Sequence, residues 1–88
     1  PSIQSVAPNR GGTGGGTELS VTGKGFVAQS IVLVGGKPAK FVKLVDPTTL
    51  ECKTPPGEAN KMVDVVVQNP DGKEATSRRA FLFDPRYG

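Results

Sequence analysis

The stretch that decides the fold is KMVDVVVQNPDGKEATSRRAFLF, residues 61–83. Within its first eight residues Val63, Val65 and Val67 occupy alternate positions, a period of two that places one face of a β-strand in a core. The sequence Asn-Pro-Asp-Gly at 69–72 is a strong turn signal. Beyond it Phe81 and Phe83 again share one face. This part of the chain therefore predicts two short strands joined by a turn.

The middle of the chain repeats this pattern of short strands and turns. Residues 30–34 end in four apolar residues, and the Gly-Gly pair at 35–36 has apolar residues on both sides, which predicts a hairpin. Residues 39–45 would be its return strand, and the Asp-Pro pair at 46–47 turns the chain. Residues 48–53 alternate again and predict a further strand.

The first third of the chain adds two more strands. A short one begins at Ile3 and ends before Pro8, and residues 9–16 are rich in glycine and predict a flexible loop. Residues 17–22 alternate between apolar and polar positions. No window shows a sustained helical stripe with caps, so we expect no substantial α-helix. About seven short strands at regular spacing predict an all-β sandwich or small barrel.

We expect the core of this sandwich to consist of the apolar residues that face inward under this alternation. They are Ile3, Val6, Leu19, Val21, Phe26, Val32, Val34, Ala39, Phe41, Leu50, Cys52, Val63, Val65, Val67, Phe81 and Phe83.

Composition narrows the class of protein. The chain has 88 residues, enough for one domain. Its 11 basic and 8 acidic residues are spread along the chain, which indicates a solvated surface and no nucleic-acid partner. No apolar run is long enough to span a membrane. The chain begins at Pro1 without a leader, so we expect residues 1–88 to be a single domain excised from a larger multidomain protein.

Catalytic and metal chemistry are not indicated. The chain has no histidine, so Cys52, the one cysteine, lacks a base and is expected to pack in the core. The glycine-rich loop is followed by a strand, whereas a phosphate-binding loop precedes a helix. Asp46, Asp71 and Asp84 each precede a turn residue and do not cluster as calcium ligands would. We therefore expect no enzyme activity, no cofactor and no metal.

The order of these motifs resembles the IPT/TIG family, the immunoglobulin-like domains of plexin-type receptors, some transcription factors and many bacterial surface proteins. The resemblance covers nearly the whole chain. Each of its six motifs is weak alone, but the six occur in the family's order and at the right spacing. The motifs are Ile3-x-x-Val6-x-Pro8, Gly15-Gly16-Thr17 with Leu19-x-Val21-x-Gly23-x-Gly25-Phe26, Val32-x-Val34-Gly35-Gly36, Leu50-x-Cys52-x-Thr54-Pro55, Val63-x-Val65-x-Val67-x-Asn69-x-Asp71-Gly72 and Phe81-x-Phe83.

The resemblance implies an early-set immunoglobulin-like β-sandwich. In receptor-type members a cysteine just after the Gly-Gly turn pairs with one before the Thr-Pro. Here Ala39 stands at the first position and Cys52 alone remains. This departure argues against a plexin-like or growth-factor-receptor-like member and favours a bacterial one.

A second apolar face is the candidate functional feature. If the valines and phenylalanines of the three strands in 31–34, 61–68 and 77–83 point inward, then Ile31, Leu33, Val66 and Leu82 point outward. In an immunoglobulin-like sandwich these strands share one sheet, so the four residues could form one outer patch. Coverage by a loop or by the return strand is the alternative.

These observations favour a non-enzymatic spacer or protein-interaction module of a bacterial cell-surface or secreted protein. Its partners would be neighbouring domains of the same chain or another protein. The first alternative is an accessory domain of a secreted polysaccharide-processing enzyme, although the absence of Trp and the single Tyr87 argue against direct carbohydrate binding. The second is an intracellular dimerisation or DNA-contacting domain of a Rel-like transcription factor, supported by Arg78-Arg79 and the net charge of +3.

Overall fold

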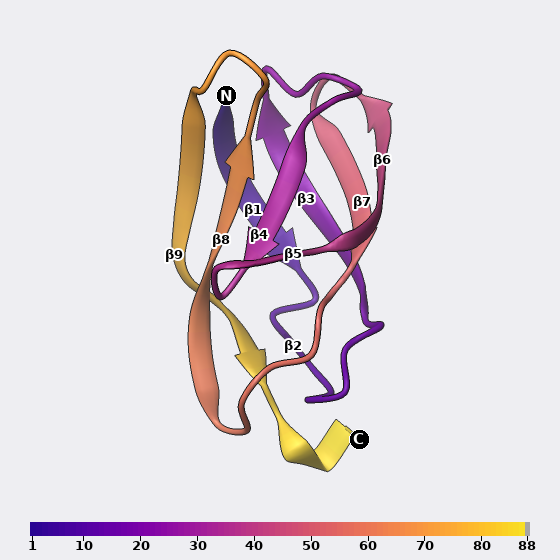
Figure 1. Cartoon of the computed structure of the whole chain (residues 1–88), viewed down its shortest axis with the longest axis vertical. Coiled ribbons are helices and arrows are strands. Elements are labelled where there is room, and N and C mark those ends of the chain that lie inside the picture. Colours follow the sequence, from indigo (N-terminus) through magenta and orange to yellow (C-terminus); the bar gives the residue numbers. More distant parts are fainter. Residues whose placement is uncertain (88) are drawn as a thin grey trace.

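The computed structural model describes residues 1–87, which form two β-sheets packed face to face (Figure 1). The four-stranded sheet has the order β1-β3-β7-β6 and the five-stranded sheet the order β2-β9-β8-β4-β5. The strands are β1 (Ser2–Ala7), β2 (Arg10–Gly11), β3 (Glu18–Lys24), β4 (Ile31–Val34), β5 (Lys37–Pro38), β6 (Lys40–Asp46), β7 (Thr49–Lys53), β8 (Lys61–Gln68) and β9 (Glu74–Phe83). One 3₁₀ turn, η1 (Pro85–Tyr87), follows β9. The predicted all-β immunoglobulin-like sandwich is confirmed, and the two strands beyond the expected seven are the two-residue strands β2 and β5.

The core lies between the sheets and matches the alternation of the sequence. Eleven of the predicted residues are buried, from Leu19 and Val21 on β3 to Phe81 and Phe83 on β9. The rings of this last pair meet edge to face, with centroids 5.2 Å apart. Ile3, Val6, Ala39 and Val63 are half-buried and pack against this cluster. Burying each large apolar side chain contributes about 1.5–3 kcal/mol.

Phe41 was expected in the core and is not there. Its side chain is 78% exposed, and its backbone has a φ of 56°. The pairing of β6 with β7 is irregular between Lys40 and Lys43, where β6 bulges. A bulge inserts a residue and shifts the alternation, so Val42 packs against the core instead and Phe41 points to solvent.

The expected hairpin after β4 is also shorter than predicted. The partner of β4 in this hairpin is β5, formed by Lys37 and Pro38, and the amide of Ala39 donates to the carbonyl of Val32 at 2.8 Å. The chain then leaves the five-stranded sheet and joins the other one as β6, beside β7. The predicted return strand at 39–45 therefore lies in the other sheet as β6 and does not pair with β4.

The glycine-rich loop is more ordered than expected. Arg10 and Gly11 form β2, which runs parallel to the end of β9. Gly11 is buried, and a Cβ there would lie 2.3 Å from the hydroxyl oxygen of Thr17. The amide of Gly16 donates to the carbonyl of Thr54 at 2.8 Å, which ties the loop to the end of β7. Glycine is needed here because the backbone packs closely against its neighbours. Close packing, and not a flexible loop, therefore accounts for the many glycines of this segment.

Candidate functional site: an outer apolar face and a fixed chain exit

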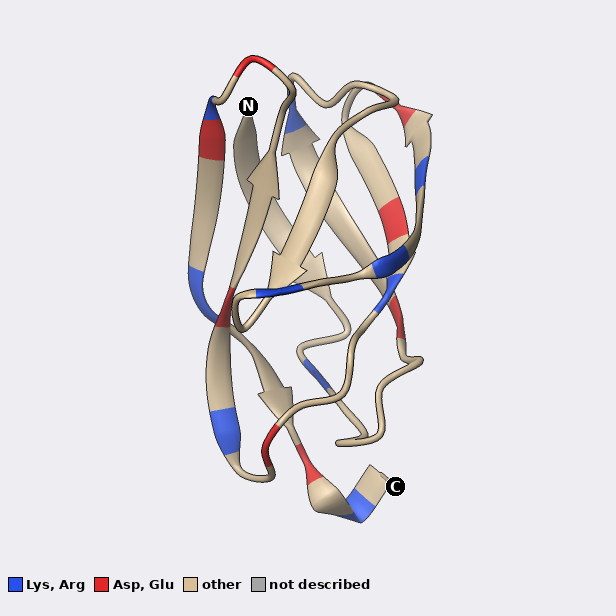
Figure 2. Cartoon of the chain, viewed as in Figure 1, with Lys and Arg blue, Asp and Glu red and all other residues tan. Residues whose placement is uncertain are grey.

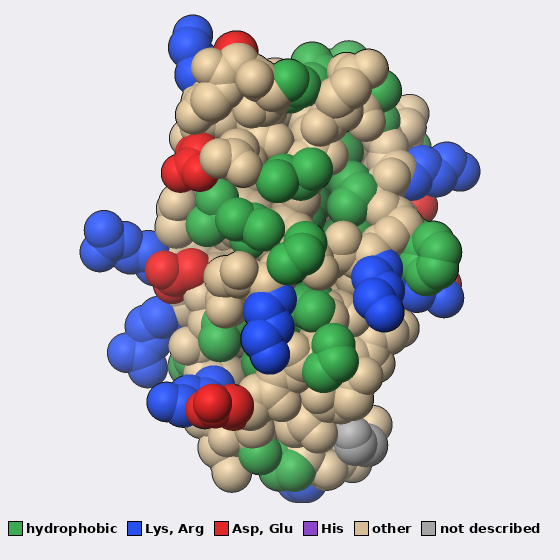
Figure 3. Space-filling model, in the orientation of Figure 1, with side chains coloured by type: hydrophobic (Ala, Val, Ile, Leu, Met, Phe, Trp, Pro, Cys, Tyr) green, Lys and Arg blue, Asp and Glu red, His purple; other side chains and the backbone are tan. Residues whose placement is uncertain are grey.

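The outer side of the five-stranded sheet carries a cluster of aliphatic side chains. Leu33 on β4 lies directly opposite Val66 on β8 and, on its other side, opposite Pro38 on β5. Ile31 lies two residues along β4 from Leu33 and is 43% exposed, while Leu33 and Val66 are half-buried. Figure 3 shows apolar side chains gathered on this side of the molecule. We call Ile31, Leu33 and Val66 the aliphatic face.

Leu82, the fourth predicted residue, does not join this cluster. It lies opposite Met62 on β8 and opposite Arg10 on β2, toward the other end of the sheet. Between Met62 and Val66 on the same side of β8 stands Asp64, where the pairing of β8 with β9 is irregular. The sequence pattern therefore identified four outward residues, of which the structure brings three together.

β9 bulges beside Asp64. Arg79 there has a φ of 51°, and its amide donates a hydrogen bond of 2.9 Å to a carboxylate oxygen of Asp64. Its guanidinium lies 3.8 Å from the sulfur of Met62. The polar Asp64–Arg79 contact thus interrupts the apolar surface and forms one border of the aliphatic face.

The end of the chain is held by a buried carboxylate. Asp84, directly after β9, is buried, and its carboxylate accepts hydrogen bonds from the guanidinium of Arg86, the shortest at 2.7 Å, and from the Arg86 amide at 3.0 Å. Arg10 lies 3.7 Å from the same carboxylate. The Asp84 amide donates to the carbonyl of Gly11 at 2.8 Å. These contacts, which we call the exit clamp, fix where the chain leaves the sandwich.

The clamp also explains the acidity of its carboxyl group. Hydrogen bonds from the Arg86 side chain and amide, and the nearby positive charges, lower the pKa of Asp84 to about 2. In the sequence, Asp84 stands out only as a turn residue. The one signal that could have found the clamp is the spacing of Asp84 and Arg86 beside a Pro, which is too common to be specific.

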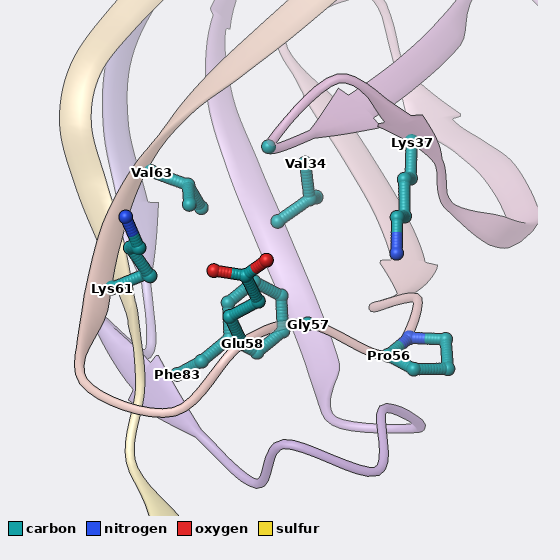
Figure 4. Close-up of a pocket in the computed structure, with 9 residues that line it drawn as sticks. Val34, Lys37, Pro56, Gly57, Glu58, Lys61, Val63 and Phe83 are labelled. Atoms are coloured by element: carbon teal, nitrogen blue, oxygen red, sulfur yellow. The ribbon is translucent and has the colours of Figure 1, made fainter.

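A shallow pocket of about 260 Å³ opens near this end of the sandwich, between the β4–β5 turn and the segment after β7 (Figure 4). Its floor is the ring of Phe83, against which Gly57 packs so closely that a Cβ would lie 2.3 Å from the ring. Glu58 stands in front of the ring, with Lys61 and Lys37 on either side. Among the residues that line it there is neither a nucleophile beside a base nor a set of metal ligands.

The reactive groups of the chain are dispersed or buried. Cys52 is buried, and desolvation raises the pKa of its thiol to about 11, as expected of a core cysteine. Across residues 1–87 the structure shows no group of three or more potential metal-ligating side chains. Figure 2 shows basic residues on many different strands and loops. None of the helical segments described is long and apolar enough to cross a membrane.

Two β-sheets packed face to face around an apolar core define an immunoglobulin-like sandwich module. Residues 1–83 match the family model described as the IPT/TIG domain, and the chain belongs to that family. Domains of this family are generally non-catalytic modules of multidomain proteins.

Relatives of known identity place similar domains in much larger chains. The chain is 37% identical over 68 residues to human fibrocystin-L, covering 76% of this chain and 2% of that protein. The mouse fibrocystin-L is 37% identical over 60 residues, covering 67% of this chain and 1% of that one. This chain thus spans only a small fraction of the curated relatives it matches.

Solved structures agree on the fold. A structure of the full extracellular region of plexin A4 superimposes with a TM-score of 0.79 at 25% identity, over 92% of this chain and 8% of that one. An auxiliary nutrient binding protein from Bacteroides ovatus gives a TM-score of 0.62 at 30% identity, over 93% and 20%. Since the relatives and solved structures include both mammalian and bacterial proteins, the bacterial origin of this chain stays a prediction.

Proposed function

We propose that this domain is a non-enzymatic, rigid spacer and protein-interaction module of a multidomain cell-surface or secreted protein. The observation that carries the proposal is the course of the chain, which enters and leaves the sandwich at opposite ends of its long axis (Figure 1). The sandwich measures 35 Å along that axis and 20 and 18 Å across it. A domain with this geometry holds its two neighbours in the chain apart.

The exit clamp supports the rigid part of this function. A linker after a frayed strand would let the next domain swing freely, whereas the Asp84–Arg86 bonds hold the chain against β2 up to η1. Membership of the IPT/TIG family and the likeness to a domain of the plexin A4 extracellular region support the cell-surface or secreted setting.

The aliphatic face supports the interaction part. Clustered exposed apolar side chains on a small domain usually mark a contact. Ile31, Leu33 and Val66 lie on the five-stranded sheet, near no catalytic or metal-binding group of the part described. We propose that a neighbouring domain of the same chain covers them. A role beside a polysaccharide-processing enzyme or in a Rel-like transcription factor rests on no observation of this kind.

Small-angle X-ray scattering of the parent protein, with and without this domain, tests the spacer function. Its removal should shorten the maximum dimension by about 35 Å, the length of the sandwich. An unchanged maximum dimension would contradict a spacer.

A matched pair of variants tests the aliphatic face in the same full-length protein. Val66→Asp should expose the covered surface and increase the spread of interdomain distances. Val45→Asp, the same substitution at an exposed position on β6 of the other sheet, should leave the distances unchanged. Equal effects of the two substitutions would show that the aliphatic face is not the joint.

A further inference from the structure

The most exposed large apolar side chain sits on the opposite sheet from the aliphatic face. Phe41 on β6, an edge strand of the four-stranded sheet, is 78% exposed. Its φ of 56° lies in the left-handed region, which a bulky residue other than glycine rarely adopts. Packing in the core does not account for this positive φ, because the ring of Phe41 is exposed to solvent.

The surface on both sides of the Phe41 ring is hollowed. A hollow of about 530 Å³ is bordered by Phe41, by Ala7 and Pro8 at the end of β1, and by polar side chains of β3 and β7. A smaller one of about 230 Å³ lies between Phe41 and the glycine-rich loop at 14–16. The ring therefore forms a ridge between two depressions, which is the shape of an anchor for a complementary surface.

Three lysines surround this ridge. Lys40 lies directly opposite Lys53 across β6 and β7, a like-charge pair that costs stability unless something compensates it. The ammonium of Lys53 lies 6.0 Å from the centre of the Phe41 ring. Lys43 lies on the same bulged strand and lines the larger hollow. The only ion pairs that the structure shows within residues 1–87 join Asp84 to Arg10 and Arg86, so none of these three ammonium groups forms an ion pair there.

Two carboxylates give the larger hollow a mixed charge. Glu18 lies opposite Lys53, and Glu51 opposite Lys43. Both border the hollow of about 530 Å³ together with those lysines. A uniform polyanion would meet repulsion from these carboxylates, whereas a protein surface can place carboxylates against the lysines and other groups against the glutamates. The pattern of charge therefore favours a protein over an acidic polysaccharide or a nucleic acid.

We propose that Phe41 is the anchor of a second docking site, which binds a protein segment carrying an apolar socket bordered by carboxylates. Phe41 fills the socket, and Lys40, Lys43 and Lys53 pair with the carboxylates. Exposed aromatic anchors with a charged rim are a common arrangement at the centre of protein interfaces. The site goes beyond the proposed spacer function and lies on the other sheet from the aliphatic face. An experiment that disproves the role of one surface therefore leaves the role of the other untouched.

Thermal unfolding of the 88-residue chain first separates function from folding. Phe41→Gly should melt at or above the temperature of the unmodified domain, because glycine adopts a φ of 56° without a Cβ clash and little buried surface is lost. A drop of several degrees would show that the ring supports the fold, and the proposal would fail.

Selection of a displayed library of random peptides on the same chain then tests binding. The enriched peptides should combine Asp or Glu with a large aliphatic residue and bind more weakly as salt increases. Phe41→Gly and Phe41→Ala should each weaken these peptides by at least about tenfold, as expected of an anchor residue. Val45→Ala, which removes another exposed side chain from β6, should change their affinity less than about twofold.

Three results would overturn the proposal. One is a selection that enriches no acidic and apolar peptides. Another is a set of peptides whose affinity is the same for the Phe41 variants. The third is tight binding of a heparin fragment that does not depend on Phe41, which would identify the lysines as a polyanion site.

Discussion

The two outer surfaces of this sandwich differ in how their apolar side chains came to be exposed. Ile31, Leu33 and Val66 lie on regular strands, and each follows from the alternation of a strand whose other side is in the core. Phe41 lies on a bulged strand with a left-handed backbone, and the same alternation places it wrongly inside. On a regular strand, apolar residues become exposed simply because the side chains alternate between the two faces. Phe41 is exposed although the alternation predicts that it is buried, and this exposure is the stronger indication of a function.

The bulges at Arg79 and Phe41 extend this comparison. Arg79 on β9 and Phe41 on β6 both have positive φ angles. The amide of Arg79 is held by the carboxylate of Asp64. No side-chain hydrogen bond holds Phe41 among residues 1–87. The left-handed turn of β9 is therefore supported by the fold, and that of β6 is supported only by its neighbours in the sheet.

The largest expected effect is a loss of stability that differs between the inward and the outward side of β8. Val67→Asp should destabilise the domain by at least about 4 kcal/mol, because it places an unpaired carboxylate in the core. Val66→Asp, one residue earlier and on the aliphatic face, should cost about 1 kcal/mol. Urea unfolding followed by circular dichroism measures both. Equal losses would mean that the aliphatic face is part of the core and is not a free surface.

Removing the charge of the exit clamp should have the next largest effect. Asp84→Asn should lower the melting temperature, because it weakens the bonds to Arg86 and Arg10. The folded-state pKa of Asp84 is depressed to about 2 from its ordinary 3.8, so its stabilisation is complete above the ordinary value. This stabilisation is lost as the pH falls from there through about 2.

Melting temperatures recorded between neutral pH and pH 2 test this prediction. The difference in melting temperature between the unmodified domain and Asp84→Asn should not depend on pH near neutrality. It should become smaller as the pH falls below the ordinary pKa of an aspartate. A difference that stays constant down to pH 2 would show that the carboxylate charge contributes nothing to the clamp.

A smaller effect sharpens the comparison of the bulges. Asp64→Ala should destabilise the domain by about 1 kcal/mol, the usual contribution of one hydrogen bond, because the amide of Arg79 loses its acceptor. Arg79→Gly in the same background should restore part of the loss, since glycine adopts a φ of 51° readily. Chemical denaturation of the single and double variants gives the coupling. Additive losses would show that Asp64 does not support the left-handed turn.

The smallest effect is expected on the aliphatic face itself. Ile31→Thr keeps a β-branched side chain in β4 and removes apolar surface from a residue that is 43% exposed. The isolated domain should change in stability by less than about 0.5 kcal/mol. Differential scanning calorimetry is sensitive enough to detect a larger change, which would mean that Ile31 stabilises the domain from within.

Much of the fold could be predicted because its strands are short, regular and separated by clear turns. Leu19, Val21, Val65 and Val67 each follow a period of two and are buried. The pattern fails where the backbone leaves that period. It could not show the bulge that turns Phe41 outward, since a bulge depends on register with the neighbouring strand.

The candidate site could be predicted only in part, for a related reason. The outward direction of Ile31, Leu33 and Val66 is a property of single strands, and the sequence carries it. The distance of Leu82 from this cluster depends on the register of β9 against β8, and the exit clamp includes the contact of Arg10 with Asp84, which are far apart in the chain. Such long-range features leave no local pattern to detect.

Hydrogen–deuterium exchange of this domain, alone and within its full-length parent protein, tests the central claim most directly. If the aliphatic face is a joint to a neighbouring domain, the amides of β4 and of β8 around Val66 should exchange more slowly in the longer protein. Those of β6 around Phe41 should change only when a separate partner is added. Identical exchange of β4 and β8 in the two proteins would contradict the account and leave the aliphatic face without a neighbouring domain.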